Sequence, residues 1–177
     1  MVQEVEIKAL LTEKQYNDLR DSLPKTCKTI NQDEITTFRF RPKDIRVRWS
    51  NKIQELVYKD GDPTSFSRKE ITVNLAQKQD CESMLALLRE LGFKDDPSWL
   101  KRKDEFVVHY KGHEYTLSLQ FIQNFAYILE AEIMTDHCID EHTQNLKEIL
   151  KNLGCQLIEP EEFTAKIQEY IKKNGVI

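Results

Sequence analysis

The stretch EVEIKA, residues 4–9 of a 177-residue chain, alternates charged and apolar side chains. Side chains two positions apart on a β-strand share a face, so Glu4, Glu6 and Lys8 form one charged row and the residues between them form an apolar row. A strand at the solvated edge of a sheet accounts for such a row. Strands whose charged rows converge inside a barrel account for it as well, so the rest of the chain must decide.

Other segments of the chain also read as strands, and three of them repeat the charged row. The predicted strands span about residues 2–10, 35–41, 44–50, 53–59, 66–75, 100–110, 114–121 and 126–134. The further charged rows are Arg46 with Arg48, Arg68 with Glu70, and Glu130 with Glu132. Short links with the sequences RPKD, DGDP and YKGHE indicate hairpins, and hairpins imply antiparallel pairing.

Amphipathic helices are predicted between and after these strands. They run from Tyr16 to Leu23 (capped by Thr12 and Gln15 and ended by Pro24), from Met84 to Gly92, from Leu146 to Gly154, and from Phe163 to Ile171. Their apolar faces need a partner, and the apolar strand faces are available. We therefore predict an α+β fold, in which a closed antiparallel β-barrel has a polar, charged interior and the helices pack outside. The whole chain, 1–177, is expected to form a single domain.

Composition excludes several function classes. The net charge of −4 argues against nucleic-acid binding through bulk electrostatics, and no apolar run approaches the roughly 20 residues of a membrane span. The chain begins directly with a strand, so we expect no targeting peptide and a cytoplasmic location. Two residue types are predicted to be structural, the cysteines as buried reduced thiols and the histidines as surface groups. They are Cys27, Cys81, Cys138 and Cys155, and His109, His113, His137 and His142.

The order of the charged motifs resembles that of the CYTH, or triphosphate tunnel metalloenzyme, superfamily. An E-x-E-x-K row is followed by an arginine pair, a lysine, an R-x-E, a basic strand and a late E-x-E, between Glu4 and about Tyr170. The superfamily includes class IV adenylyl cyclases, thiamine triphosphatases and inorganic tripolyphosphatases. The resemblance implies a closed antiparallel barrel whose tunnel holds a triphosphate and one or two Mg²⁺ or Mn²⁺ ions.

The resemblance also implies a role for each charged residue. Glu4, Glu6, Glu130 and Glu132 would hold metal, Arg46, Arg48, Lys59, Arg68, Lys101 and Lys103 would bind the phosphates, and Lys8 would activate the attacking water through a lowered pKa. The chemistry agrees, since hard divalent cations prefer oxygen ligands and arginine forks match phosphate geometry. With Glu70 included, this lining has an excess of two positive charges, which a triphosphate and one Mg²⁺ would roughly neutralise.

Some positions depart from the family pattern. Gln120 stands where the family usually has an acidic residue, and Lys103 replaces the arginine of a usual K-x-R motif. Gln120 is expected to face the tunnel, where its carbonyl would ligate the metal or its amide would hold a neighbouring arginine. Arg39 and Arg41 are additional cations, and the sequence leaves open whether they face inward.

The leading functional prediction is a divalent-metal-dependent phosphohydrolase that acts on an inorganic, nucleoside or thiamine triphosphate. One alternative is a class IV adenylyl cyclase that converts ATP to cyclic AMP and pyrophosphate. Another is a module that binds a triphosphate without turning it over. The expected partner is a triphosphate-containing small molecule, with no membrane or nucleic-acid partner, and both a monomer and a homodimer remain open.

Overall fold

The computed structural model describes residues 3–61 and 67–174, which form nine strands and four helices. The strands are β1 (Gln3–Leu11), β2 (Lys28–Arg41), β3 (Asp44–Trp49), β4 (Gln54–Asp60), β5 (Ser67–Asn74), β6 (Lys94–Tyr110), β7 (His113–Ile122), β8 (Ala126–Thr135) and β9 (Leu157–Ile158). The helices are α1 (Glu13–Thr26), α2 (Lys78–Glu90), α3 (Ile139–Asn152) and α4 (Pro160–Asn174).

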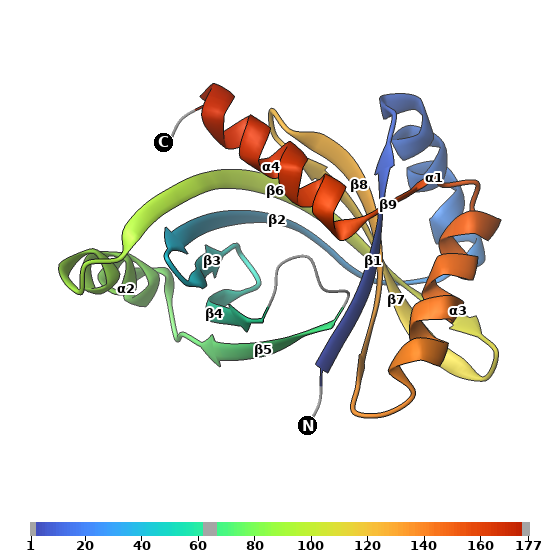
Figure 1. Ribbon diagram of the computed structural model, residues 1–177, viewed down its shortest axis with the longest axis horizontal. Helices are drawn as coiled ribbons and strands as arrows, with labels where there is room; N and C mark the ends of the chain where they lie inside the picture. The colour runs from blue at the N-terminus through green and yellow to red at the C-terminus, as the bar shows by residue number, and fades with distance from the viewer. Residues whose placement is uncertain (1–2, 62–66, 175–177) are drawn as a thin grey trace.

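The strands from β1 to β8 close into one antiparallel barrel (Figure 1). Neighbouring strands follow the order β5-β4-β3-β2-β6-β7-β8-β1, and β1 then pairs with β5. This closure is made at the start of β1, where Glu4 lies opposite Arg68. Further along the same strand, Lys8 and Ala9 pair with the short β9. The predicted closed antiparallel barrel is therefore confirmed.

Two strands are longer than the sequence predicts. β2 begins at Lys28 rather than near residue 35, and β6 begins at Lys94 rather than near residue 100. The additional part of β2 pairs with β6. Asp33, for example, lies opposite Lys103. These residues lack a clear alternation, and it is the neighbouring strand, rather than local preference, that holds them extended. Of the predicted hairpin links, DGDP lies partly outside the described residues.

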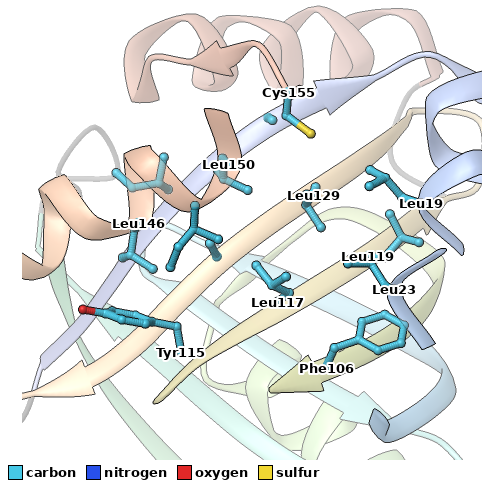
Figure 2. Packing of buried hydrophobic residues seen from close by; sticks show 14 of the residues in the cluster. Leu19, Leu23, Phe106, Tyr115, Leu117, Leu119, Leu129, Leu146, Leu150 and Cys155 are labelled. Atoms are coloured by element: carbon cyan, nitrogen blue, oxygen red, sulfur yellow. The ribbon is translucent and has the colours of Figure 1, made fainter. Parts of the chain in front are cut away.

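The outer face of the barrel packs against helices α1 and α3. Figure 2 shows the resulting core, in which leucines of β7 and β8 lie between leucines of the two helices. The labelled members include Leu117, Leu119, Leu129, Leu19, Leu23, Leu146 and Leu150. Helix α2 covers a smaller cluster around Phe40 and Val47. Because both cores lie outside the barrel, the inward faces of the strands are free to carry charge.

The helices do not cover every apolar strand face. Ile71 and Val73 on the outer face of β5 are 43% and 50% exposed, although the sequence predicts that helices cover such faces. Helix α2, which follows β5 in the chain, packs on β3 and β4 instead. Within the described ranges, none of the helices combines the length and apolar content that crossing a membrane requires.

Three local predictions are corrected by the structure. Helix α1 continues through Pro24 to Thr26, because a proline in the last turn removes only its own N–H from the helix. His142 is buried at 2% exposure and its Nδ1 lies 3.0 Å from the Tyr115 hydroxyl, so it is a core group and not a surface one. All four cysteines are free, as expected, but Cys138 is exposed at the start of α3.

Candidate functional site

The barrel encloses a cavity of about 560 Å³ with a strongly charged lining. Every residue to which the sequence assigns a site role lines this cavity, including the uncertain group Glu70, Gln120, Arg39 and Arg41. Ten cationic and eight acidic side chains contribute to the described lining, an excess of two positive charges. The alternating charged rows therefore converge inside the barrel, because inward positions on every strand recur with period two.

Glutamates of β1 and β8 form an acidic group on one side of the cavity. Glu6 lies directly opposite Glu132 in the β1–β8 ladder. One carboxylate oxygen from each of Glu4, Glu6 and Glu132 lies within 4.8 Å of the others. Burial and the nearby charges of Glu130, Glu4 and Glu6 raise the pKa of Glu132 to about 7. These three carboxylates are a hard oxygen donor set whose repulsion a divalent cation would relieve.

Glu130, the fourth glutamate predicted to bind metal, has other partners. Lys8 lies opposite it in the ladder, and the Lys8 ammonium is 2.8 Å from Glu130 and 2.7 Å from Glu6. Burial opposes the charge on Glu130, but Lys8 and Lys101 outweigh burial and hold the pKa of Glu130 well below its usual range. Glu130 is therefore held in place as the anionic partner of Lys8.

The expected lowering of the Lys8 pKa is wrong for this arrangement. Burial alone would lower the pKa of Lys8, but the attraction of Glu130 and Glu6 is larger and raises it above the ordinary lysine value. The β1–β8 register sets Lys8 opposite Glu130, and Glu6 stands two residues before it on β1, so the ammonium lies between two carboxylates. A lysine held so firmly in its charged form is a structural cation and a poor proton acceptor.

Gln120 faces the cavity, as predicted, but its side-chain amide bonds a carboxylate and not an arginine. Its side-chain amide donates to the Glu130 carboxylate. Gln120 thus supports the Lys8–Glu130 pair, which explains why an uncharged residue is suited to this position.

Arginines of β2, β3 and β5 form a basic group around one aspartate. Asp44 accepts two hydrogen bonds from Arg46, at 2.9 and 2.8 Å, and its oxygens lie 3.5 Å from Arg39 and 3.1 Å from Arg68. These guanidinium groups outweigh burial and hold the pKa of Asp44 well below its usual range. The Nε atoms of Arg39 and Arg68 are buried without a hydrogen-bond partner among the described residues.

Asp44 is the main site residue that the sequence analysis missed. It stands in the turn-like stretch RPKD, where an aspartate reads as a turn residue. Its spacing from Arg46 and Arg48, two and four positions, was the available signal, because those intervals place it in the same inward row. Arg41 lies at the rim of the cavity, with a side chain that is 57% exposed and 3.1 Å from Asp96.

The remaining cations of the lining differ in whether they form ion pairs with carboxylates. Lys59 bonds Glu4 and lies 3.0 Å from Glu70, and Arg48 lies 2.8 Å from Glu55. Lys101 lines the same cavity. Among the described residues it takes part in no ion pair within 4.0 Å, whereas its neighbours Arg102 and Lys103 on β6 do. Burial, followed by the charges of Lys103 and Arg48, lowers the pKa of Lys101 to about 7.

Comparisons with known proteins agree with this architecture at the level of fold. No family model matches the chain, and no curated protein matches its sequence. Among solved structures, PH1819 from Pyrococcus horikoshii OT3 is 24% identical, with a TM-score of 0.71 over 94% of this chain and 98% of that one. PH1012 from the same organism is 21% identical, with a TM-score of 0.73 over 90% of this chain and 98% of that one.

Two similar structures carry functional descriptions of their own. A candidate adenylate cyclase from Vibrio parahaemolyticus is 17% identical, with a TM-score of 0.65 over 86% of this chain and 89% of that one. HpAC1 from Hippeastrum, a candidate adenylyl cyclase described as having a dominant triphosphatase activity, is 15% identical, with a TM-score of 0.63 over 90% of both chains. The closed eight-strand barrel with its charged interior and these structural likenesses show that this chain has the CYTH, or triphosphate tunnel, fold.

Proposed function

We propose that this protein is a divalent-metal-dependent enzyme that hydrolyses a triphosphate inside the barrel. The observation that carries the proposal is one cavity lined both by three crowded carboxylates and by a group of arginines and lysines. A triphosphate with a bound divalent cation is complementary to both groups at once.

The acidic group would hold the metal through Glu4, Glu6 and Glu132. Their hard oxygens suit Mg²⁺ or Mn²⁺, and burial together with the like charges of Glu130, Glu4 and Glu6 raises the pKa of Glu132. When bound, the ion would supply positive charge and Lewis acidity to the phosphate oxygens. Glu130 and Lys8 keep their ion pair beside this group and orient Glu6.

The basic group would bind and orient the phosphate chain. Arg39 and Arg68 contribute guanidinium groups to the lining, and Lys101 contributes an ammonium that has no carboxylate within ion-pair distance among the described residues. An arriving phosphate supplies the missing negative charge, so binding should return Lys101 to its charged form. Preorganised cations of this kind stabilise charge that develops on the phosphate oxygens during transfer.

The same clamp would serve a class IV adenylyl cyclase, and the two candidate cyclases of similar fold keep that alternative open. Incubation with tripolyphosphate, ATP and thiamine triphosphate, each with Mg²⁺ or Mn²⁺, separates the candidates. Release of orthophosphate supports the hydrolase, and cyclic AMP with pyrophosphate supports the cyclase. Tight binding without any product supports a binding module.

The control for this assay is Glu6→Gln, which removes one carboxylate of the acidic group at nearly constant volume. We expect this variant to fold and to lose most metal-dependent turnover. Product formation that persists in the Glu6→Gln preparation would come from a contaminating phosphatase or would contradict the proposed metal site.

A further inference from the structure

One end of the cavity is aromatic. Trp99 of β6, Phe125 of the β7–β8 turn and Phe163 of α4 all line it. The Trp99 and Phe125 rings are 6.4 Å apart between centroids with planes within 10°, and Phe125 and Phe163 are 6.1 Å apart. Ile122, Ile128 and Ile167 complete this wall. We call this set of six residues the aromatic wall.

The topology places the aromatic wall beside the phosphate-binding cations. Trp99 stands two residues before Lys101 on β6, and Phe125 follows the end of β7. Helix α4 follows β9, which pairs with β1 at Lys8 (Figure 1). The Arg39 guanidinium lies 5.2 Å from the centre of the Trp99 ring, and the Lys8 ammonium lies 5.6 Å from the centre of the Phe163 ring.

The aromatic wall is not part of either hydrophobic core. Neither the cluster under α1 and α3 nor the cluster under α2 includes Trp99, Phe125 or Phe163. All three side chains are half-buried and border the cavity. Large aromatic groups in such a position, with a few charged groups converging beside them, are typical of a site for an organic ligand.

An inorganic triphosphate would gain no binding free energy from the aromatic wall. Its surface consists of charged oxygens, and these lose hydration beside apolar groups without gaining a partner. A planar heterocycle gains from the same contact, because stacking on aromatic side chains is favourable for any ring with a π-face. The cavity volume of about 560 Å³ also lies within the range that buries an organic molecule.

We propose that the substrate is an organic triphosphate whose planar heteroaromatic group lies against the aromatic wall while its phosphates lie among the arginines and Lys101. This inference rests on the proposed triphosphate function and narrows it by excluding tripolyphosphate as the preferred substrate. A nucleoside triphosphate and thiamine triphosphate share the required chemistry, and the experiment distinguishes them.

The test compares the affinity for an inorganic triphosphate with the affinity for organic triphosphates. It uses metal-free protein, so that turnover does not interfere. Calorimetry gives the dissociation constants of tripolyphosphate, ATP and thiamine triphosphate for the native chain, Trp99→Ala and Trp99→Leu. The readout is the ratio of organic to inorganic affinity, which cancels losses of folded protein. We expect either substitution to lower this ratio by about 5- to 150-fold for the preferred organic ligand, with little change for tripolyphosphate.

The chain offers a matched control and a direct reporter. Trp49, the other of its two tryptophans, stacks on Phe38 at 4.8 Å in the cluster under α2. Trp49→Phe should leave the affinity ratio unchanged and leave Trp99 as the sole tryptophan. In that variant, the preferred organic triphosphate should quench or shift the Trp99 emission much more than tripolyphosphate does.

Two different failures are distinguishable. If tripolyphosphate binds as tightly as both organic ligands and the ratio is unchanged in Trp99→Ala, the organic-substrate inference is overturned while the proposed function stands. If none of the three triphosphates binds, in the presence or absence of Mg²⁺ and Mn²⁺, the proposed function fails and the inference with it.

Discussion

On the acidic and basic sides of the cavity, the pKa of a lysine side chain is shifted in opposite directions. Lys8 and Lys101 are both lysines that face the cavity from a barrel strand. On the acidic side, Glu130 and Glu6 raise the pKa of Lys8, whereas on the basic side burial, Lys103 and Arg48 lower the pKa of Lys101 to about 7. Burial lowers the pKa of both lysines, so the neighbouring charges decide which of them is a fixed charge and which titrates.

The largest effect is expected from Glu132→Gln on the acidic side. Turnover with metal should fall by at least about a hundredfold, because one of three grouped carboxylates is lost. The metal-free protein should become more stable at pH 8, because the raised pKa of Glu132 means that its charged form is disfavoured in the fold. A gain of about 1 kcal/mol would raise the melting temperature by roughly 2–4 °C.

The matched control for this prediction is Glu105→Gln. Glu105 is a partly buried carboxylate two residues after Lys103 on β6, and its pKa is lowered because Lys103 and Asn31 outweigh the effect of burial. Neutralising Glu105 should therefore destabilise the protein, opposite in sign to Glu132→Gln. Equal and downward shifts in melting temperature for both variants would contradict the conclusion that the charged form of Glu132 is disfavoured in the fold.

On the basic side, Arg48→Ala should weaken triphosphate binding by about ten- to a hundredfold, because a guanidinium bonded to a phosphate oxygen contributes about 1.5–3 kcal/mol. The loss for orthophosphate should be much smaller, since a single phosphate does not need the full row of cations. Calorimetry with both ligands measures the difference. Arg89→Ala, which removes an exposed arginine paired with Asp95 on the outside of the barrel, is the control.

A smaller effect, on the pH dependence of triphosphate affinity, is expected from Lys101. Its ammonium is charged below pH 7 and largely neutral above it, and an anionic ligand favours the charged form. Affinity for tripolyphosphate should therefore be highest below pH 7 and fall by up to about tenfold as the pH rises through 7 to 8.5. Lys101→Arg stays charged throughout this range, so its profile should lack this component.

The pH comparison has an internal control in Lys103→Arg. Carboxylates around Lys103 raise its pKa, so this lysine is already charged across the whole range. The ligand's own titration is common to all three proteins and cancels. A native profile that matches Lys101→Arg rather than Lys103→Arg would show that Lys101 does not titrate near neutrality.

The smallest effect on metal binding is expected from Gln120→Leu. The substitution removes the amide that bonds Glu130 but leaves the three grouped carboxylates in place. We expect a loss of stability of about 1–2 kcal/mol from the under-bonded carboxylate and an unchanged metal concentration at half-maximal activity. A clear increase in that metal concentration would show that Gln120 contributes to metal binding.

The sequence by itself determined which strand face carries each charge. A period of two is a local property, so alternation alone puts Glu6, Arg48 and Glu130 on the charged faces of their strands. The apolar faces of the same strands also indicated where the helices pack. The extra length of β2 was not predictable in this way, because its polar residues are held only by pairing with β6.

Only the tertiary structure decided which charges are neighbours. Lys8 and Glu130 are far apart in the chain and meet only through the β1–β8 register, and the strands beside Lys101 are likewise set by the place of β6 between β2 and β7. The aromatic wall likewise joins residues from a strand, a turn and a helix. Coulomb energies depend on distances across the barrel, and these distances exist only once β1 and β5 have closed it.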